Sequence, residues 1–366
     1  AHMNDLYPDV KVLWTGMDTF NEFLTGSDFD TVHGIIGRPT VLWDNYYAND
    51  GGDGFIGRIL LGVYEGRTGD LTEVLDGIVN NPSIQGGLTR LAIATSGTWF
   101  EHPDSTSRQE QVEDALALEA PRFLGVGTDP ALPLELLMDT FNSKTLGVSG
   151  HREFESLIDT LETRLEAAPL DIESVLSNMG ELASLAARLN VLYTTLYHSR
   201  VDPEMMDEVV YPLRKVRFES EVVLYALLGL TERLAGRPGT AFFDEADGAT
   251  QRSSECRFQF STEYSERLIN ACKGRPPVDR GVELVPAVPI PQTPISTAQE
   301  WVYKPFPVPC SSLQVFGLPG AALDDEGEIR WTPPYPGRFS GSVICQNNSA
   351  PEPSLGWTRF DLIVLP

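Results

Sequence analysis

One segment, residues 43–50 (WDNYYAND), combines aromatic, amide and acidic side chains that could bind a polar ligand. It begins where an apolar run at 39–43 ends, and such a run predicts a buried strand. In α/β folds, ligand-binding side chains gather beyond the carboxyl ends of the strands. Asn and Asp offer hydrogen-bond donors and acceptors, and Trp offers a flat apolar face, a combination that suits a sugar. The segment is therefore a candidate sugar-binding loop. The alternative is a loop whose Asn and Asp side chains only cap a helix and stabilise turns.

Other chemically suggestive residues of the sequence favour structural roles. Asp324 and Asp325 lie in a turn-like sequence, and Asp244 and Glu245 lie in an acidic, Gly-flanked stretch, so we expect neither pair to be catalytic. Four histidines without clustered carboxylate or Cys partners are expected at the surface or in packing: His33, His102, His151 and His198. The sequence has no Walker loop, HExxH, nucleophile elbow or GxGxxG after a strand. We therefore predict no metal site and no cofactor.

Composition excludes several classes of protein. The 366 residues carry a formal charge of −25, from 52 acidic and 27 basic side chains, which argues against binding to a nucleic-acid backbone. No apolar run approaches the roughly 18 residues of a membrane-spanning helix. The cysteines all lie in the C-terminal third without a CxxC pair. If two of them are oxidised, we expect Cys310 to pair with Cys345 within one β domain, whereas any other connectivity stays open.

The elements that must position the candidate loop fall in the first hundred residues. Within 4–103, the apolar runs 10–14, 39–43 and 88–95 predict buried parallel strands. Helical spacing at 20–36 and 71–79 lies between them. This β–α–β–α–β order predicts a parallel α/β sheet or barrel.

The rest of the chain divides into three further parts. Residues 104–235 predict an antiparallel helical bundle from periodic apolar positions at 109–118, 154–168, 172–197 and 204–234. A Leu/Ala stripe in this part predicts core packing: Leu182, Leu185, Ala186, Leu189 and Leu192. Residues 236–290 lose periodicity and gain Gly and Pro, which predicts an irregular linker. Residues 291–366 predict a small immunoglobulin-like β-sandwich. Its expected strands are 301–303, 313–316, 328–332, 338–346 and 357–365.

Six segments, in the same order and at similar spacing, resemble the family 84 glycoside hydrolases, which are β-N-acetylglucosaminidases. They are 6–16 (LYPDVKVLWTG), 37–45 (GRPTVLWDN), 48–50 (AND), 61–67 (LGVYEGR), 77–82 (GIVNNP) and 94–99 (ATSGTW). The resemblance implies that 4–103 form the last strands of a (β/α)8 barrel, followed by a helical bundle. Separately, residues 317–339 resemble immunoglobulin-like modules of bacterial extracellular proteins, which favours an extracellular or periplasmic protein.

The resemblance also implies roles for individual residues. Asn45, Asp50 and Asn81 match residues that bind substrate hydroxyls, Trp43 matches a tryptophan of the sugar pocket, and Trp99 matches the tryptophan that closes the last barrel strand. Two positions depart from the family pattern, because Gly51 stands where some members have Tyr and Val63 replaces a Pro.

The catalytic groups implied by the resemblance are an adjacent Asp-Asp pair on an earlier barrel strand. One Asp polarises the substrate's 2-acetamido group, which attacks the anomeric carbon, and the other acts as acid and base in this substrate-assisted retaining mechanism. Because the resemblance begins near the sixth strand, we expect this pair upstream of Met3, and we assign no catalytic residue within the chain.

The expected function is therefore the C-terminal portion of an enzyme that cleaves terminal β-GlcNAc from glycans or glycoproteins. The alternative is a non-catalytic carbohydrate-binding or protein-interaction protein derived from the same family. A barrel with three strands has an open edge, so we expect self-association, pairing with the missing N-terminal half, or packing of the edge against the bundle.

Overall fold

A computed structural model describes most of the chain. The described residues are 9–51, 58–119, 131–142, 151–198, 201–256, 263–277, 283–285, 294–297, 299–307, 310, 312–316, 318, 320–324, 326–333, 337–347 and 354–365. The chain divides into two compact units. Unit 1 contains residues 1–123, 134–151 and 202–208, and unit 2 contains 124–133, 152–201 and 209–366. No helix of the described part is long and apolar enough to cross a membrane.

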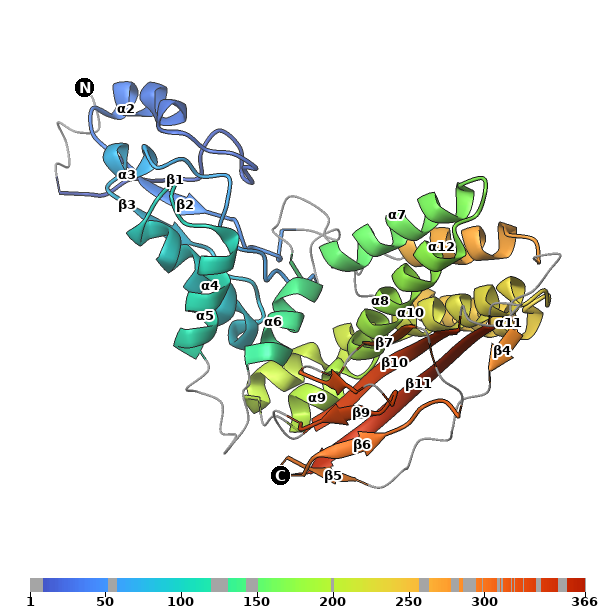
Figure 1. Cartoon of the computed structure of the whole chain (residues 1–366). Helices are drawn as coiled ribbons and strands as arrows, with labels where there is room; N and C mark the ends of the chain where they lie inside the picture. Colours follow the sequence, from blue (N-terminus) through green and yellow to red (C-terminus); the bar gives the residue numbers. More distant parts are fainter. Residues whose placement is uncertain are drawn as a thin grey trace. The chain divides into compact units, whose positions relative to one another are not determined.

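Unit 1 is built on a parallel sheet of three strands in the order β1-β2-β3 (Figure 1). The strands are β1 (Leu13–Trp14), β2 (Val41–Asp44) and β3 (Gly77–Asn80). Between β1 and β2 lie the short 3-10 helix η1 (Gly26–Phe29) and α2 (Asp30–Ile36). Gly37 ends α2 in the left-handed conformation, with φ of 81°, which favours glycine. The short helix α3 (Leu71–Val74) precedes β3.

Three further helices of unit 1 follow the sheet in the sequence. They are α4 (Gly86–Glu101), α5 (Arg108–Glu119) and α6 (Ala131–Thr140), the last of which begins among residues of unit 2. Helix α4 packs on α5.

The two faces of this sheet differ in what covers them. One face contributes to a hydrophobic cluster formed by Leu24, Phe29, Leu42 and Leu71, with Trp14 and Ile78 packed against it. The opposite face carries Leu13, Trp43 and Val79, which are 50%, 37% and 42% exposed. Trp43 and Val79 are neighbours across β2 and β3. Among the described residues β1 and β3 are edge strands, and the self-association expected from such an open sheet stays a prediction.

The predicted strand at 88–95 is wrong, because these residues lie within α4. Leu88, Leu91, Ala92 and Thr95 are buried at positions i, i+3, i+4 and i+7, which is helical spacing. A short apolar run is compatible with a buried strand or a buried helix, so the run alone did not decide between them. The third strand is instead β3, within and just beyond the stretch 71–79 for which a helix was predicted. Of the helix predicted at 20–36, the structure forms η1 and α2.

Unit 2 contains helices that the apolar periodicity predicts well and others that it misses. The predicted helices appear as α7 (Arg152–Glu166), α8 (Ile172–Asn190), α9 (Leu192–His198) and α10 (Pro203–Leu234), whose first residues belong to unit 1. The single helix predicted at 172–197 is thus two helices, with Val191 between α8 and α9. The Leu/Ala stripe of α8 and α9 is buried, as predicted.

The prediction of an irregular linker at 236–290 is wrong over much of this stretch. The stretch contains α11 (Thr240–Ser254) and α12 (Glu263–Gly274). The buried side chains of α11 are Phe243, Ala246, Ala249 and Ser253. Their spacing is helical, but three of the four are small, so the apolar signal in the sequence is weak. Asp244 and Glu245, which we predicted not to be catalytic, lie on α11.

The C-terminal part of unit 2 consists of two sheets around one core. The larger sheet has the order β4-β11-β10-β7, with β5 also paired to β11, and the smaller has the order β6-β9-β8. The strands of the larger sheet are β4 (Glu283–Val285), β5 (Ile295–Ser296), β7 (Ser312–Phe316), β10 (Gly337–Asn347) and β11 (Ser354–Leu365). The strands of the smaller sheet are β6 (Trp301–Tyr303), β8 (Ala322–Leu323) and β9 (Ile329–Trp331).

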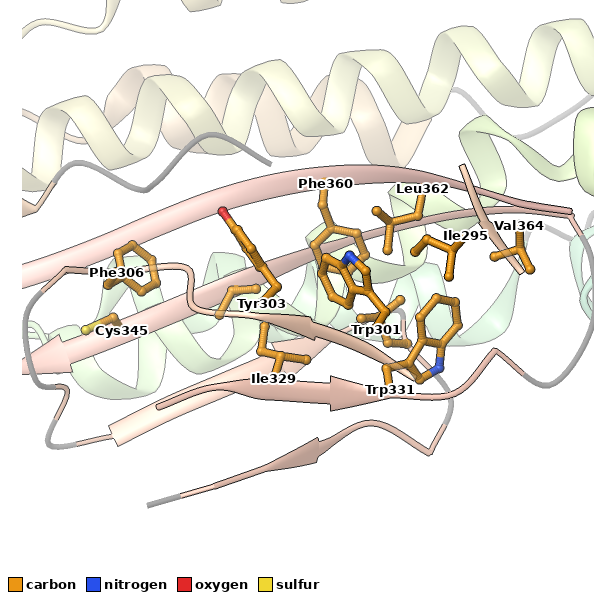
Figure 2. Close-up of a cluster of buried hydrophobic side chains, with 12 residues drawn as sticks. Ile295, Trp301, Tyr303, Phe306, Ile329, Trp331, Cys345, Phe360, Leu362 and Val364 are labelled. Carbon is orange, nitrogen blue, oxygen red and sulfur yellow. The ribbon is translucent and has the colours of Figure 1, made fainter. Parts of the chain in front are cut away.

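Side chains from both sheets meet in this core, as Figure 2 shows. Trp301 and Trp331 of the smaller sheet lie with Phe360 and Leu362 of β11 in one buried cluster. A disulfide joins Cys310 to Cys345, as predicted from the sequence. Helices α8 and α9 contact β10. All five predicted strands occur close to their predicted bounds, whereas the immunoglobulin-like classification stays a prediction.

Candidate functional site

The carboxyl ends of β2 and β3 bring two of the predicted site residues together. β2 ends at Asp44 and β3 ends at Asn80, so Asn45 and Asn81 are the first residues beyond two adjacent parallel strands. The Asn81 backbone N–H donates to the Asp44 carbonyl oxygen at 2.8 Å and continues the pairing by one residue. The sheet thus places two amide side chains next to each other at the edge where α/β folds bind ligands.

Asn45 is the centre of a hydrogen-bond network at this edge. Its Oδ1 accepts from Trp43 Nε1 and from Asn81 Nδ2, both at 2.9 Å. Its Nδ2 donates to the Thr19 carbonyl oxygen in the loop after β1, at 2.7 Å. Asn45 is 8% exposed, whereas Trp43 is 37% exposed. The network fixes the indole by its N–H and leaves part of the Trp43 ring accessible.

Asp50 lies at the end of the same segment and is exposed. The next residue, Gly51, lies against an aromatic side chain, because a Cβ added there would be 2.8 Å from Phe20 Cζ. Any larger side chain at position 51 therefore requires Phe20 to move.

Trp99 occupies a different environment from the other four predicted residues. It lies on α4, is 4% exposed, and packs edge-on against Tyr64 and Phe100, with ring centroids 5.3 and 5.1 Å apart. Since residues 94–99 are helical, Trp99 does not close a barrel strand. A direct contact between Trp99 and a sugar stays a prediction.

Asp44, the last residue of β2, forms a buried ion pair with Arg67. We did not single out this pair in the sequence. Arg67 Nε and Nη2 donate to Asp44 Oδ2 and Oδ1 at 2.9 and 2.8 Å, and both side chains are almost fully buried. Tyr64 donates its hydroxyl to Asp44 Oδ2 at 2.6 Å. The Arg67 guanidinium also lies over the Tyr46 ring, 4.8 Å from its centroid. The end of β2 is thus fixed by bonds to the buried side chain of its last residue.

The pKa values of this cluster follow from its burial. Burial raises the pKa of the Tyr64 hydroxyl well above its usual value, and the neighbouring Asp44 carboxylate raises it further. Burial is the largest single effect on the pKa of Arg67 and lowers it, but the hydrogen bonds to Asp44, the charge of Asp44 and the neighbouring Tyr64 and Tyr46 together outweigh burial and raise it. Tyr64 therefore stays a neutral donor and Arg67 stays charged. In the sequence, Tyr64 and Arg67 lie together in the LGVYEGR segment at 61–67, and Asp44 lies in the segment at 37–45, but nothing in the pattern pairs the two segments.

Comparison with known proteins decides the family of this region. A family model described as "NAGidase: beta-N-acetylglucosaminidase" matches residues 1–123. Residues 1–123 belong to the family 84 glycoside hydrolases. We call them the family-84 region. It contains all five predicted site residues and the Asp44–Arg67 pair.

The relatives of the chain extend well beyond it. The chain is 28% identical over 236 residues to protein O-GlcNAcase of Mus musculus, an alignment that covers 56% of this chain and 25% of that protein. The chain thus spans about a quarter of the length of this curated relative.

Two solved structures share the fold. One is a mutant of the Thermobaculum terrenum O-GlcNAc hydrolase, with a TM-score of 0.59 and 18% identity, covering 72% of this chain and 55% of that one. The other is CpGH84B, with a TM-score of 0.60 and 17% identity, covering 72% and 45%.

Proposed function

We propose that the family-84 region supplies the GlcNAc-binding part of a β-N-acetylglucosaminidase. In this proposal Trp43 stacks on the sugar, Asn45, Asp50 and Asn81 bind its hydroxyls, and Trp99 supports the site. The enzyme as a whole would remove terminal β-GlcNAc from glycans or glycoproteins by substrate-assisted retaining hydrolysis. The observation that carries the proposal is the Asn45 network, which joins Trp43 and Asn81 at the carboxyl edge of the sheet.

The carboxylates near this edge support sugar binding more than catalysis. Asp44 is buried in its pair with Arg67, so its carboxylate is not accessible to a substrate at this edge. Asp50 is exposed and has no adjacent acidic residue in the sequence. Substrate-assisted hydrolysis needs one carboxylate to polarise the acetamido group and another to transfer protons. We therefore propose that the Asp-Asp pair comes from another polypeptide segment and that residues 1–366 bind GlcNAc without turning it over.

The second candidate is a carbohydrate-binding protein without catalytic activity at any stage. The same observation on Asp44 and Asp50 favours it, and the two-sheet C-terminal part suits a non-catalytic contact module, which we propose to be immunoglobulin-like. Both candidates require GlcNAc binding and differ in whether a partner segment restores hydrolysis.

Two assays on the full chain test the proposal. The first assay measures the affinity for N-acetylglucosamine by saturation-transfer NMR. The affinity should be lower by a factor of about ten or more in Asp50→Ala and Trp43→Ala, since each variant loses a proposed direct contact with the sugar. Tyr197→Ala is the matched control, because Tyr197 is an exposed aromatic residue of α9 in unit 2. Equal binding by all four proteins would refute the sugar site. Hydrolysis of a fluorogenic β-GlcNAc glycoside by the chain alone, lost in Asp50→Ala, would instead show a complete catalytic site here.

A further inference from the structure

We propose that Asn49 is a positioning residue: its hydrogen bonds hold the loop after β2 against the loop after β3, so that Asp50 and Asn81 can bind the same ligand. We call the contacts of Asn49 with Arg58, Ile84 and Gln85 the Asn49 brace. The inference rests on the proposed sugar site for its functional consequence. The brace itself is a structural feature that can be tested without any ligand.

The contacts of Asn49 use almost all of its hydrogen-bonding capacity. The residue is completely buried. Its Nδ2 donates to Gln85 Oε1 at 2.6 Å and to the Arg58 carbonyl oxygen at 2.8 Å, and its Oδ1 accepts from the Ile84 backbone N–H at 2.8 Å. A backbone N–H can only donate and a carbonyl oxygen can only accept, so these two partners fix which way the amide points.

The brace lies beside both residues that it is proposed to position. Asp50 follows Asn49 directly in the chain, so fixing the Asn49 side chain in the interior limits where the exposed Asp50 carboxylate can be. Ile84 and Gln85 follow Asn81 within the same loop, which connects β3 to α4. Asn81 is held from its other side by the Asn45 network. The two loops are thus joined once at the strand ends and once at Asn49.

The far end of the second loop is itself anchored. Gln85 immediately precedes α4. Two backbone N–H groups in the first turn of this helix, those of Gly87 and Leu88, donate to Glu208 Oε1 and Oε2 at 3.1 and 2.8 Å. A carboxylate at a helix N-terminus satisfies donors that have no partner within the helix and interacts favourably with the helix dipole. Arg90 of α4 also pairs with Asp202 at 3.0 Å. Because α4 is held at this end, the brace ties the Asp50 loop to a fixed point.

Two substitutions separate the bonds of the brace. Asn49→Ala removes all three, so that the Ile84 backbone N–H and the Arg58 carbonyl oxygen lose their bonds to the Asn49 side chain. Asn49→Asp keeps the acceptor for the Ile84 N–H, and Gln85 can turn its side-chain amide to donate to the new carboxylate oxygen. The bond to the Arg58 carbonyl is lost, and a buried carboxylate oxygen then faces that carbonyl oxygen, which is unfavourable. Asn178→Ala is the matched control, because Asn178 is also buried and donates to a backbone carbonyl, that of Leu157 in unit 2.

The test measures amide hydrogen exchange and N-acetylglucosamine binding on the full chain, at a temperature where all variants are folded. In Asn49→Ala we expect the Ile84 amide to exchange about tenfold faster or more and the affinity to fall by a similar factor. In Asn49→Asp we expect Ile84 to stay protected, with an intermediate affinity. Asn178→Ala should change neither quantity.

Two results would overturn the inference. One is unchanged exchange at Ile84 in Asn49→Ala, and the other is a loss of affinity in Asn178→Ala as large as that in Asn49→Ala. If the unsubstituted chain fails to bind N-acetylglucosamine, the proposed sugar site is refuted, and the exchange measurement alone still decides whether the brace exists.

Discussion

Removing one partner of the buried Asp44–Arg67 pair should destabilise unit 1 by an unusually large amount. Arg67→Met removes the guanidinium but keeps a long apolar side chain. It leaves the Asp44 carboxyl group buried, with the Tyr64 hydroxyl as its remaining side-chain donor among the described residues. Breaking a buried pair by removing one partner costs about 3–5 kcal/mol. The two lost charge-assisted bonds, at about 1.5–3 kcal/mol each, give a similar sum.

Hydrogen exchange of the β2 amides is the appropriate assay, because the chain has two units and one global transition need not describe both. A loss of 3–5 kcal/mol accelerates exchange through local opening about a hundredfold or more. Lys11→Met is the matched control in the same unit, since Lys11 pairs with Asp76 at 2.6 Å but is 63% exposed. Exposed pairs contribute little, so this variant should exchange like the unsubstituted protein.

A double substitution shows whether the cost comes from the charge left behind. Asp44→Asn together with Arg67→Met leaves neither charge in the interior. Its cost should be smaller than the sum of the two single costs by about 2 kcal/mol or more. Additive costs, or an Arg67→Met variant that exchanges like Lys11→Met, would refute the assignment of this pair as a buried, coupled unit.

Two further predictions concern unit 2. Burial raises the pKa of Glu219, whose carboxylate accepts from Ser253 and Ser265, so folding loses stability as the pH rises from about 4.3 through the folded pKa. Glu219→Gln should therefore gain stability relative to the parent between pH 4 and pH 7 in urea unfolding, and an unchanged difference would contradict this. Cys310→Ser with Cys345→Ser should destabilise the two-sheet part by roughly 4 kcal/mol, because the disulfide closes a loop across a sequence separation of 35. Equal hydrogen exchange of β10 with and without the disulfide would count against this.

Elements with a strong local signal could be predicted from the sequence. Helix α7 and the long helices α8 and α10 repeat apolar residues over several turns, so most of their bounds follow from the pattern. β10 and β11 are long strands separated by turn residues, and their prediction was close. The segment at 43–50 also contains three residues of the candidate site, Trp43, Asn45 and Asp50, and two that support it, Asp44 and Asn49, at the end of β2 and in the loop after it. Such features are local, since each depends on residues a few positions apart.

Elements with a weak or ambiguous local signal required the tertiary structure. The apolar run at 88–95 fits either a strand or a helix, and its packing in α4 decides for the helix. Helix α11 buries mainly small side chains, which do not stand out in a hydrophobic pattern.

The sequence alone was enough to identify the family of the first hundred residues and the residue types of the proposed sugar site. How those residues are held could be seen only in the folded structure. Asp44 meets Arg67 from 23 positions away, Asn49 meets Gln85 from 36, and the α4 N-terminus meets Glu208 from 120. Such contacts satisfy charges and backbone groups that burial has removed from water. The partner of each group depends on which distant segments the fold brings together, so it cannot be predicted from a local pattern in the sequence.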